Sequence, residues 1–312
     1  MVDPLAEVVS LLHPTTRFSK LVSGAGSWRV RRTEAGQPFY CVILDGACTL
    51  AVDGQADISL QNGDFVLIPA AHGFTMSSLV PPAAESVDTT PIEMLHGEFR
   101  LGLQDTEPDV RLLVGHCAFG SPDAALLVSL LPQLIHVRGE KRLTTLVQLV
   151  GEESRALRPA RDVILARLLE VLLIEALRAT AGTAAPPGLM RGLADARLAA
   201  ALRQMHDHPS QPWSVAELAK VAALSRSAFF ERFSRALGMA PMAYLLAWRM
   251  ALAKNMLSRT AANVAVVAER VGYSSASTFS VAFTRQVGLS PARYAQEQMA
   301  SLAALDQEFP QK

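Results

Sequence analysis

The sequence has no excess of charge of either sign, because its 29 Lys and Arg residues are matched by 29 Asp and Glu. Taken over the whole chain, this balance argues against nucleic acid as a partner, since proteins that bind polyanions usually carry excess Lys and Arg. The chain also lacks any uncharged apolar run of the ~18–20 residues that cross a bilayer. We therefore expect no membrane partner.

Cysteine is scarce, and the features of an export signal are missing. Cys41, Cys48 and Cys117 form an odd and sparse set, which is typical of reduced thiols rather than of a disulfide framework. The first residues, MVDPLAEVVSLLHP, contain an acid and prolines where a secretory signal has a basic region and a cleavage site. These features predict a cytoplasmic protein.

What the sequence does contain is a division of charge along its length. Half of the 312 residues are hydrophobic, which excludes global disorder, and at ~100–200 residues per domain the length suggests about two domains. The segment Ala179–Gly188 is small, uncharged and ends in Pro-Pro-Gly, as linkers do. Residues 1–189 carry 15 basic and 21 acidic side chains, a net charge of −6, whereas residues 190–299 carry 13 and 6, a net charge of +7. The neutral total conceals a basic module that suits double-stranded DNA.

The basic half contains an internal repeat. When residues 229–244 are placed over residues 279–294, six positions are identical at one offset of 50 residues. Chance rarely produces such agreement, so we expect both segments to share one structure. The repeated positions are Phe229, Phe233, Arg235, Gly238, Pro241 and Tyr244 in the first copy, and Phe279, Phe283, Arg285, Gly288, Pro291 and Tyr294 in the second.

Each copy is preceded by a shorter helical pattern and a tight turn. In the first copy, Ser214 caps the shorter helix, and a second helix is expected over residues 226–237 after a cap at Ser225. In the second copy, Ser274 or Ser275 caps a helix that runs to about residue 287. Helix, tight turn and helix, present twice, predict two helix-turn-helix units.

The segment between the two copies is expected to be a long helix that joins them. Apolar residues over Met242–Ser258 recur at helical spacing and predict a helix about 25 Å long at ~1.5 Å per residue. A rigid helix of that length sets two recognition helices roughly one DNA turn, about 34 Å, apart on one face of a duplex. The same pattern also fits an ordinary core helix.

The second helix of each unit is expected to enter the major groove with one face and to pack into the protein with the other. The repeated Phe pairs form the buried stripe and are not expected to contact DNA. Arg235 and Arg285, later on each helix, suit phosphate contacts that position the protein without reading sequence. The candidates for contact with bases are Arg226, Ser227, Phe230, Glu231, Ser277, Ser280 and Val281.

The acidic half begins with short β-rich segments separated by turn residues. Asp45-Gly46 separates two apolar runs and Asp53-Gly54 follows the second, which predicts two hairpins. Several short strands with Gly-rich turns favour a small β-barrel or jelly roll. Residues 142–178 then predict two helices divided near Arg158-Pro159, with apolar residues on more than one face. Such helices suit burial against both the barrel and a second protomer, although a simple intramolecular pair remains an alternative.

These residues carry a family resemblance. Over about 195–297, the segments WSVAELA, SRSAFFERF, GMAPMAYLLAWRM and VGYSSASTFSVAFTRQVGLSPARY resemble the AraC/XylS transcription regulators, in which Gly-x-x-Pro-x-x-Tyr follows each recognition helix. The run from Leu44-Asp-Gly46 through Gly63-Asp64 to Pro69 and His72, together with the opening DPLAEVVSLLHP, resembles the cupin-type sensor domain of the same family. The resemblance implies a homodimer and, for an activator, contact with RNA polymerase.

Two positions depart from the family pattern. Relatives often have Arg late on the exposed face of each recognition helix, where this chain has Glu231 and Val281. Glu accepts a hydrogen bond from cytosine N4 and Val contacts a thymine methyl group, but neither makes the contact between Arg and guanine. The second recognition helix is therefore expected to bind mostly through the DNA backbone and shape.

The expected fold class is α+β with several domains. A cupin-like β-barrel sensor occupies residues 1–125, a helical dimerisation segment residues 126–180, and a linker residues 181–193. An all-α DNA-binding domain with two helix-turn-helix units occupies residues 194–299.

The barrel is not expected to be a catalyst. Cupin enzymes bind metal through a His-x-His pair, a Glu and a later His, but GQPFYCVILDG contains neither His nor Glu. His72 remains, and one imidazole does not supply the three or four ligands of a metal site. Nothing in the spacing of His96, His116 and His136 indicates that they complete one. We expect no catalytic residue, no metal and no cofactor.

The sensor candidates are therefore His72 and the three cysteines, Cys41, Cys48 and Cys117. The cysteines form a redox sensor if their thiols are exposed and of low pKa, and are small buried hydrophobic residues otherwise. Altogether the sequence predicts a DNA-binding transcription regulator whose barrel senses a small molecule or a redox signal. The alternatives are a barrel that only dimerises and, opposed by the missing ligands, a cupin enzyme fused to a DNA-binding domain.

Overall fold

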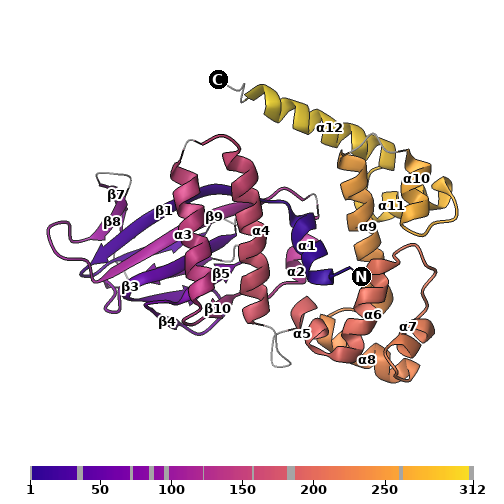
Figure 1. The fold of residues 1–312 in the computed structure, drawn as a ribbon, viewed down its shortest axis with the longest axis horizontal. Coiled ribbons are helices and arrows are strands. Elements are labelled where there is room, and N and C mark those ends of the chain that lie inside the picture. The colour runs from indigo at the N-terminus through magenta and orange to yellow at the C-terminus, as the bar shows by residue number, and fades with distance from the viewer. Residues whose placement is uncertain are drawn as a thin grey trace. The chain divides into compact units, whose positions relative to one another are not determined.

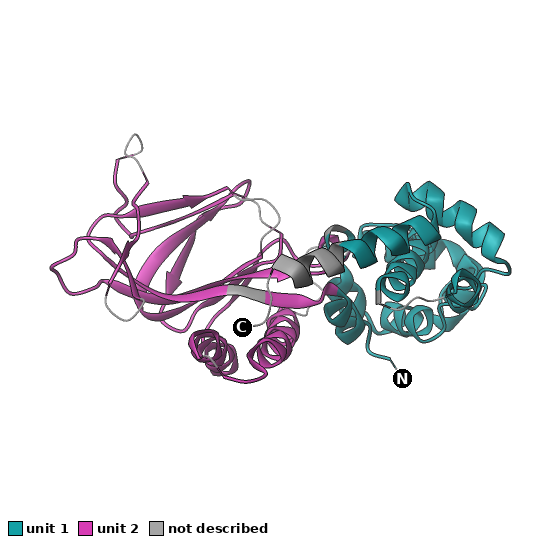
Figure 2. Cartoon of the chain, turned by 90° about the horizontal axis from the view of Figure 1, so that it is seen from above, with its two compact units in different colours: residues 1–11, 121–126, 187–312 teal, residues 12–120, 127–186 magenta. Residues whose placement is uncertain are grey.

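The computed structural model describes residues 2–33, 38–70, 73–83, 88–94, 98–121, 123–156, 158–180, 187–259 and 263–308. The chain divides into two compact units, which Figure 2 colours separately. The sheet-rich unit comprises Leu12–Gly120 and Leu127–Pro186, and the helical unit comprises Met1–Leu11, Ser121–Leu126 and Pro187–Lys312.

The described residues of the sheet-rich unit form a ten-stranded sheet that curves into a half-barrel (Figure 1). Strand β3 belongs to both layers, because its first half pairs with β5 and β9 and its second half with β4 and β6. The predicted barrel is confirmed. The strands are β1 (Pro14–Ala25), β2 (Arg29–Arg32), β3 (Phe39–Val52), β4 (Ile58–Gln61), β5 (Phe65–Ile68), β6 (Phe74–Ser77), β7 (Ile92–Glu93), β8 (Glu98–Gly102), β9 (Val110–Phe119) and β10 (Ile135–Val137).

One of the two predicted hairpins is wrong. Asp45 and Gly46 lie inside β3, at an irregularity where the register against β9 shifts and the strand passes from one layer to the other. Gly46 has φ +71°, and a Cβ atom there would collide with the backbone carbonyl of Asp109, so this position requires glycine. The Asp-Gly pair marks a bulge at this point. Asp53-Gly54 is confirmed as the turn between β3 and β4.

Two helices, α3 (Lys141–Arg155) and α4 (Arg161–Ala179), lie side by side on one face of the sheet (Figures 1 and 2). Leucine and valine side chains on their inner faces are buried. The predicted helix pair divided near Arg158 is confirmed. The short helix α2 (Ala124–Ser129) precedes them in the sequence.

The helical unit contains the predicted joining helix, α9 (Pro241–Arg259). Among the described residues, no single helix is both long and apolar enough to cross a membrane, and α8 and α9 meet that test only as a pair bent by 55°. The other helices of the unit are α1 (Pro4–Leu12), α5 (Leu189–Ala194), α6 (Ala196–Asp207), α7 (Val215–Val221), α8 (Arg226–Leu237), α10 (Val264–Arg270), α11 (Ala276–Val287) and α12 (Pro291–Glu308).

Candidate DNA interface and sensor cavity

The first helix-turn-helix unit consists of α7 and α8. Ser214 and Glu217 form a reciprocal capping box: Ser214 Oγ accepts the backbone N–H of Glu217 at 3.2 Å, and Glu217 Oε2 accepts that of Ser214 at 2.7 Å. Ser225 Oγ accepts the backbone N–H of Ala228 at 3.2 Å and so begins α8, which ends at Gly238 in the left-handed region. The predicted caps are confirmed.

The second unit consists of α10 and α11. Ser275, rather than Ser274, is the cap, because its Oγ accepts the backbone N–H of Thr278 at 3.1 Å. Gly272 makes the turn between the two helices with φ +83°, and Gly288 ends α11 with the same angle. The two predicted helix-turn-helix units are therefore both present.

Both recognition helices are fixed by the repeated aromatic residues. Phe229 and Phe233 are fully buried with ring centroids 5.5 Å apart, and Phe279 and Phe283 are fully buried at 5.4 Å. The tyrosine that follows each helix packs edge-on against the second phenylalanine, at centroid distances of 5.8 and 5.5 Å. The repeated aromatic positions therefore form a repeated core, as predicted for the phenylalanines.

The opposite face of α8 is exposed. Arg226, Ser227, Phe230, Glu231 and Arg235 all face solvent, and Phe230 is 45% exposed although it is large and apolar. A cation, a hydroxyl, an aromatic ring and a carboxylate together can contact phosphates, base edges and thymine methyl groups.

The corresponding face of α11 is smaller and less polar. Ser277, Val281 and Arg285 are exposed, with Val281 72% exposed. Ser280 is half-buried, and its Oγ donates a hydrogen bond to the carbonyl oxygen of Ala276 at 2.7 Å. The candidate residues of each helix thus share one face. Ser280 is hydrogen-bonded within α11, and the hydroxyls of Ser227 and Ser277 lie 3.3 and 3.0 Å from those of the capping residues Ser225 and Ser275.

Two segments from the beginning and middle of the sequence belong to this helical unit. In α1, Glu7 Oε2 lies 2.7 Å from His206 Nδ1, and Nε2 of the same imidazole lies 2.8 Å from Tyr244 Oη. The ring also stacks on Trp248 at a centroid distance of 4.0 Å. Burial lowers the pKa of His206, although the Glu7 carboxylate acts in the opposite direction. The imidazole therefore ties α1 to the core of the first helix-turn-helix unit.

The second of these segments is residues 121–126. The carboxylate of Asp123 accepts a hydrogen bond from the ammonium group of Lys254 on α9, and both side chains are largely buried. The two links join residues 199 and 131 positions apart in the chain. Sequence analysis missed both, because single-sequence patterns report on neighbouring residues and not on pairings at such distances.

The half-barrel encloses a cavity of about 290 Å³. The lining residues alternate along parts of β1, β2, β6, β8 and β9, so that on these stretches every second side chain faces inward, as the period of a strand requires. The lining residues are Phe18, Lys20, Val22, Trp28, Val30, Arg32, Phe39, Phe74, Met76, Pro91, Phe99, Leu101, Leu112, Val114 and His116.

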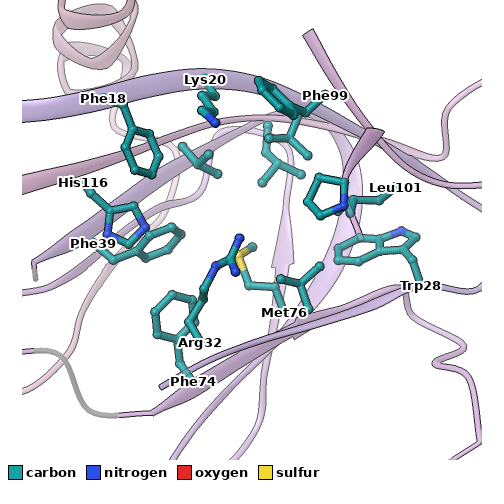
Figure 3. Close-up of a pocket in the computed structure, with 15 residues that line it drawn as sticks. Phe18, Lys20, Trp28, Arg32, Phe39, Phe74, Met76, Phe99, Leu101 and His116 are labelled. Carbon is teal, nitrogen blue, oxygen red and sulfur yellow. The ribbon is translucent and has the colours of Figure 1, made fainter. Parts of the chain in front are cut away.

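The cavity combines an apolar wall with cationic groups. Figure 3 shows the side chains of Lys20 and Arg32 entering it from opposite walls. Lys20 Nζ lies 3.9 Å from the ring centroid of Phe99 and 5.0 Å from that of Phe18. Sequence analysis did not single out any lining residue except His116, although the alternation in β1 and β9 was a signal that could have indicated them.

The three cysteines are buried in the sheet-rich unit. Burial raises the pKa of Cys48 and of Cys117 to about 12, and raises that of Cys41 well above its ordinary value. Cys41 and Cys48 lie on one continuous strand, β3, on either side of the Asp45-Gly46 bulge that replaces the predicted hairpin turn. Since the thiolate is the reactive form, this environment favours the interpretation of the cysteines as small core residues.

The histidines are dispersed. His72 and His96 lie outside the described residues. His116 lines the cavity, tilted against two phenylalanine rings at centroid distances of 4.8 and 5.2 Å. His136 Nε2 lies 3.1 Å from the carboxylate of Asp64. Within the described ranges, no three His, Cys, Asp or Glu side chains come together as metal ligands would.

Comparisons with known proteins match both units. A family model described as Cupin matches residues 3–182, and one described as Helix-turn-helix domain matches residues 218–297. An AraC-like transcription regulator of Streptomyces lividans is 34% identical over 299 residues, which cover 94% of this chain and 97% of that protein. Another AraC-like transcription regulator, from Streptomyces antibioticus, is 33% identical over 304 residues, which cover 95% of this chain and 99% of that protein.

Among solved structures, the DNA-binding domain of AdpA in complex with a target DNA is 30% identical, over 38% of this chain and 99% of that chain, with a TM-score of 0.31. The two long matches to AraC-like regulators run through the half-barrel and both helix-turn-helix units. The chain therefore belongs to the AraC family of DNA-binding transcription regulators and carries a cupin-like N-terminal domain.

Proposed function

We propose that this regulator, acting in the cytoplasm as a homodimer, senses a small molecule in the half-barrel cavity and changes its DNA binding in response. The observation that carries the proposal is the cavity itself, about 290 Å³ of mostly apolar space with a few charged groups. Ligand sites in proteins are concave, mostly apolar and supplied with a small number of polar groups that orient the ligand, and most have volumes of about 300–1,000 Å³.

A redox signal is the weaker of the two predicted inputs. A cysteine sensor needs an accessible thiol with a substantial thiolate fraction. Burial raises the pKa of Cys41, Cys48 and Cys117 instead, so these thiols remain protonated at neutral pH. We therefore assign the sensing role to the cavity and a packing role to the cysteines.

Chain connectivity supports a route from the cavity to the DNA-binding helices. β1 and β9 pair along most of their length and supply six of the lining residues. One residue separates β1 from α1, and β9 is followed by residues 121–126; both of these segments belong to the compact helical unit. A ligand that shifts β1 against β9 therefore acts on α1, which is hydrogen-bonded to His206 on α6, and on residues 121–126, which are hydrogen-bonded to Lys254 on α9.

On the DNA, the exposed faces of α8 and α11 are the proposed contacts. Arg226, Ser227, Phe230 and Glu231 face bases from α8, while α11 presents the smaller set of Ser277, Ser280 and Val281. Arg235 and Arg285 are assigned to phosphates because they lie late on each helix and are exposed. The logarithm of the binding constant falls linearly with the logarithm of the salt concentration. If each arginine neutralises one phosphate, Arg235→Ala and Arg285→Ala each make that slope shallower by about one. Binding that is insensitive to salt would contradict these contacts.

The outer faces of α3 and α4 are the proposed dimer contact. Leu149 on α3 and Val163, Ile164 and Val171 on α4 are exposed although they are apolar, with Val163 64% exposed. Large exposed apolar residues on neighbouring helices are typical of interfaces. Val163→Glu is expected to shift sedimentation toward the monomer, whereas an unchanged sedimentation coefficient would show that a different surface is used.

The sensing proposal is tested with a variant that fills the cavity. Operator sequences are first selected from random DNA duplexes with the purified full chain. A panel of metabolites is then screened by thermal shift, because a ligand that binds the folded state raises its unfolding temperature by mass action. We expect a stabilising compound to change operator affinity in the wild type and in Val80→Trp, an exposed control, but not in Val114→Trp, which occupies the cavity.

Two results would contradict the proposal. A compound that acts equally on Val114→Trp must bind elsewhere. If no compound in a broad panel stabilises the protein or changes operator affinity, the half-barrel is a dimerisation module that senses nothing.

A further inference from the structure

The charged side chains that line the cavity in the described residues are all basic. Lys20 and Arg32 both enter it, and none of its fifteen lining residues is acidic. Within the described ranges, neither side chain has an acidic partner at ion-pair distance, whereas the neighbouring Arg31 on the same strand is paired with Asp53 at 2.6 Å on the outside of the barrel. Lys20 contacts two aromatic rings and Arg32 is exposed to solvent, but neither has an acidic partner among the described residues, so a ligand that carries a negative charge complements both cations.

The remaining lining excludes a strongly hydrated ligand. Among the described residues that line it, none carries a hydroxyl, amide or carboxylate group, and twelve of the fifteen are aliphatic, aromatic, proline or methionine. A sugar or nucleotide would lose hydrogen bonds to water that this wall does not replace. A ligand with one anionic group and an apolar body matches the distribution of the lining.

The volume limits the size of that body. An engineered cavity of about 150 Å³ holds benzene, so a cavity about twice as large suits a molecule of roughly twelve to fifteen non-hydrogen atoms. Phenylalanine and tryptophan rings from five different parts of the half-barrel surround the space (Figure 3), and flat or extended groups pack well against such rings.

We propose that the cavity binds a small monocarboxylate with an aromatic or aliphatic body, whose carboxylate pairs with Arg32 and Lys20. The planar guanidinium of Arg32 can hold both carboxylate oxygens, and Lys20 adds a second positive charge from the opposite wall. This inference rests on the proposed function, which assigns effector binding to the same cavity, and it adds the chemical class of the effector.

The test compares three probes that share one body and differ in charge: phenylbutyrate, phenylbutanamide and phenylbutylamine. Binding to the full chain is measured by calorimetry. The carboxylate is expected to bind at least about tenfold more tightly than the amide, the scale of a hydrogen bond to a charged group, and the amine is expected not to bind.

Substitutions then identify the side chains that make the cavity prefer the carboxylate over the amide. Arg32→Gln and Lys20→Met are each expected to reduce the ratio of carboxylate to amide affinity by about fivefold or more, while Arg31→Gln, the matched control on the outer face, leaves that ratio unchanged. Because the ratio compares two probes on one protein, it does not depend on how much of each variant is folded.

The outcomes separate the two proposals. If the amide or the amine binds as tightly as the carboxylate, or if Arg31→Gln alters the ratio as much as Arg32→Gln, the ligand class is wrong while sensing in the cavity stands. If none of the three probes binds at about 10 mM, the ligand class is overturned as well. Failure of sensing itself is seen only in the Val114→Trp comparison on operator DNA.

Discussion

The two helix-turn-helix units share the same kind of core but differ at the exposed surface that we propose to face DNA. Phenylalanine pairs at 5.5 and 5.4 Å and tyrosines packed at 5.8 and 5.5 Å repeat almost without change. The exposed faces have diverged, because α8 presents Arg226, Phe230 and Glu231 where α11 presents a small hydroxyl and Val281.

The difference teaches which constraints act on each face. A fully buried aromatic pair must keep its shape, because any change in volume leaves a cavity or a clash. The exposed faces are free of that packing constraint, so under the proposed DNA contacts each helix can carry the residues that suit the base pairs beneath it. Among the described residues, only the core of the first unit is hydrogen-bonded to α1, through His206 and Tyr244.

The largest expected effect tests whether the two cores are equivalent. Phe229→Ala and Phe279→Ala each remove a fully buried ring and are each expected to cost about 3–5 kcal/mol of unfolding free energy. Chemical denaturation followed by circular dichroism measures both. A loss of less than about 1 kcal/mol for one variant alone would show that its core tolerates the cavity and that the equivalence fails.

The tyrosines that follow the two recognition helices provide a sharper contrast. Tyr244 Oη is bonded to His206, whereas the buried Tyr294 Oη has no hydrogen-bond partner within the described ranges. Tyr244→Phe is therefore expected to cost about 1–2 kcal/mol, and Tyr294→Phe less than about 0.5 kcal/mol. Equal losses in thermal and chemical unfolding would mean that the bond to His206 contributes nothing.

We expect substitutions on the exposed face of α8 to affect base recognition more than substitutions on that of α11. If the Glu231 carboxylate accepts a hydrogen bond from a cytosine amino group, as proposed, Glu231→Gln is expected to weaken binding to the selected operator by about fivefold and to relax the preference at one base pair. Val281→Ala is expected to change affinity by less than about twofold, on the prediction that α11 binds mostly through the DNA backbone. Fluorescence anisotropy on operators with single base changes measures both. A larger effect at Val281 would reverse the assignment.

The smallest effect is a pH dependence confined to the first unit, because residues 209–312 contain no histidine. Burial lowers the pKa of His206 in the folded protein, so the unfolded chain binds the proton more readily. Its contribution to stability is complete above the unfolded value of about 6.5 and declines as the pH falls below it. His206→Gln is expected to flatten the fall in unfolding temperature between about pH 7.5 and 5.5. An identical slope in wild type and variant would remove His206 as its source.

The sequence predicted what local patterns determine. The caps at Ser214 and Ser225 and the buried Phe229 and Phe233 follow from spacing within one or two helical turns, and all agree with the structure. Asp45-Gly46 misled the analysis, because the same dipeptide that makes a hairpin turn also permits a bulge in a continuous strand.

Alternation along β1 and β9 indicates which side chains share a face of each strand, but neither the closure of the cavity nor the hydrogen bonds of α1 follow from such local patterns. Lys20 and Arg32 are ordinary basic residues in the sequence, and only strand curvature brings them to opposite walls of one space. Glu7 gives no indication that its partner lies 199 positions later in the chain. The base-facing assignments on α8 and α11 stay predictions, since exposure on the correct face does not itself establish contact with DNA.

The distance between Glu7 and His206 has a consequence for biosynthesis. At roughly 5–20 residues per second, α1 leaves the ribosome about 10–40 s before the histidine it binds has been made. During that interval the apolar side of α1, with Leu5, Val8 and Val9, has no partner from α6 or α9. The first helix to be synthesised is thus among the last to reach its place, and a nascent chain that stalls before α6 leaves it uncovered.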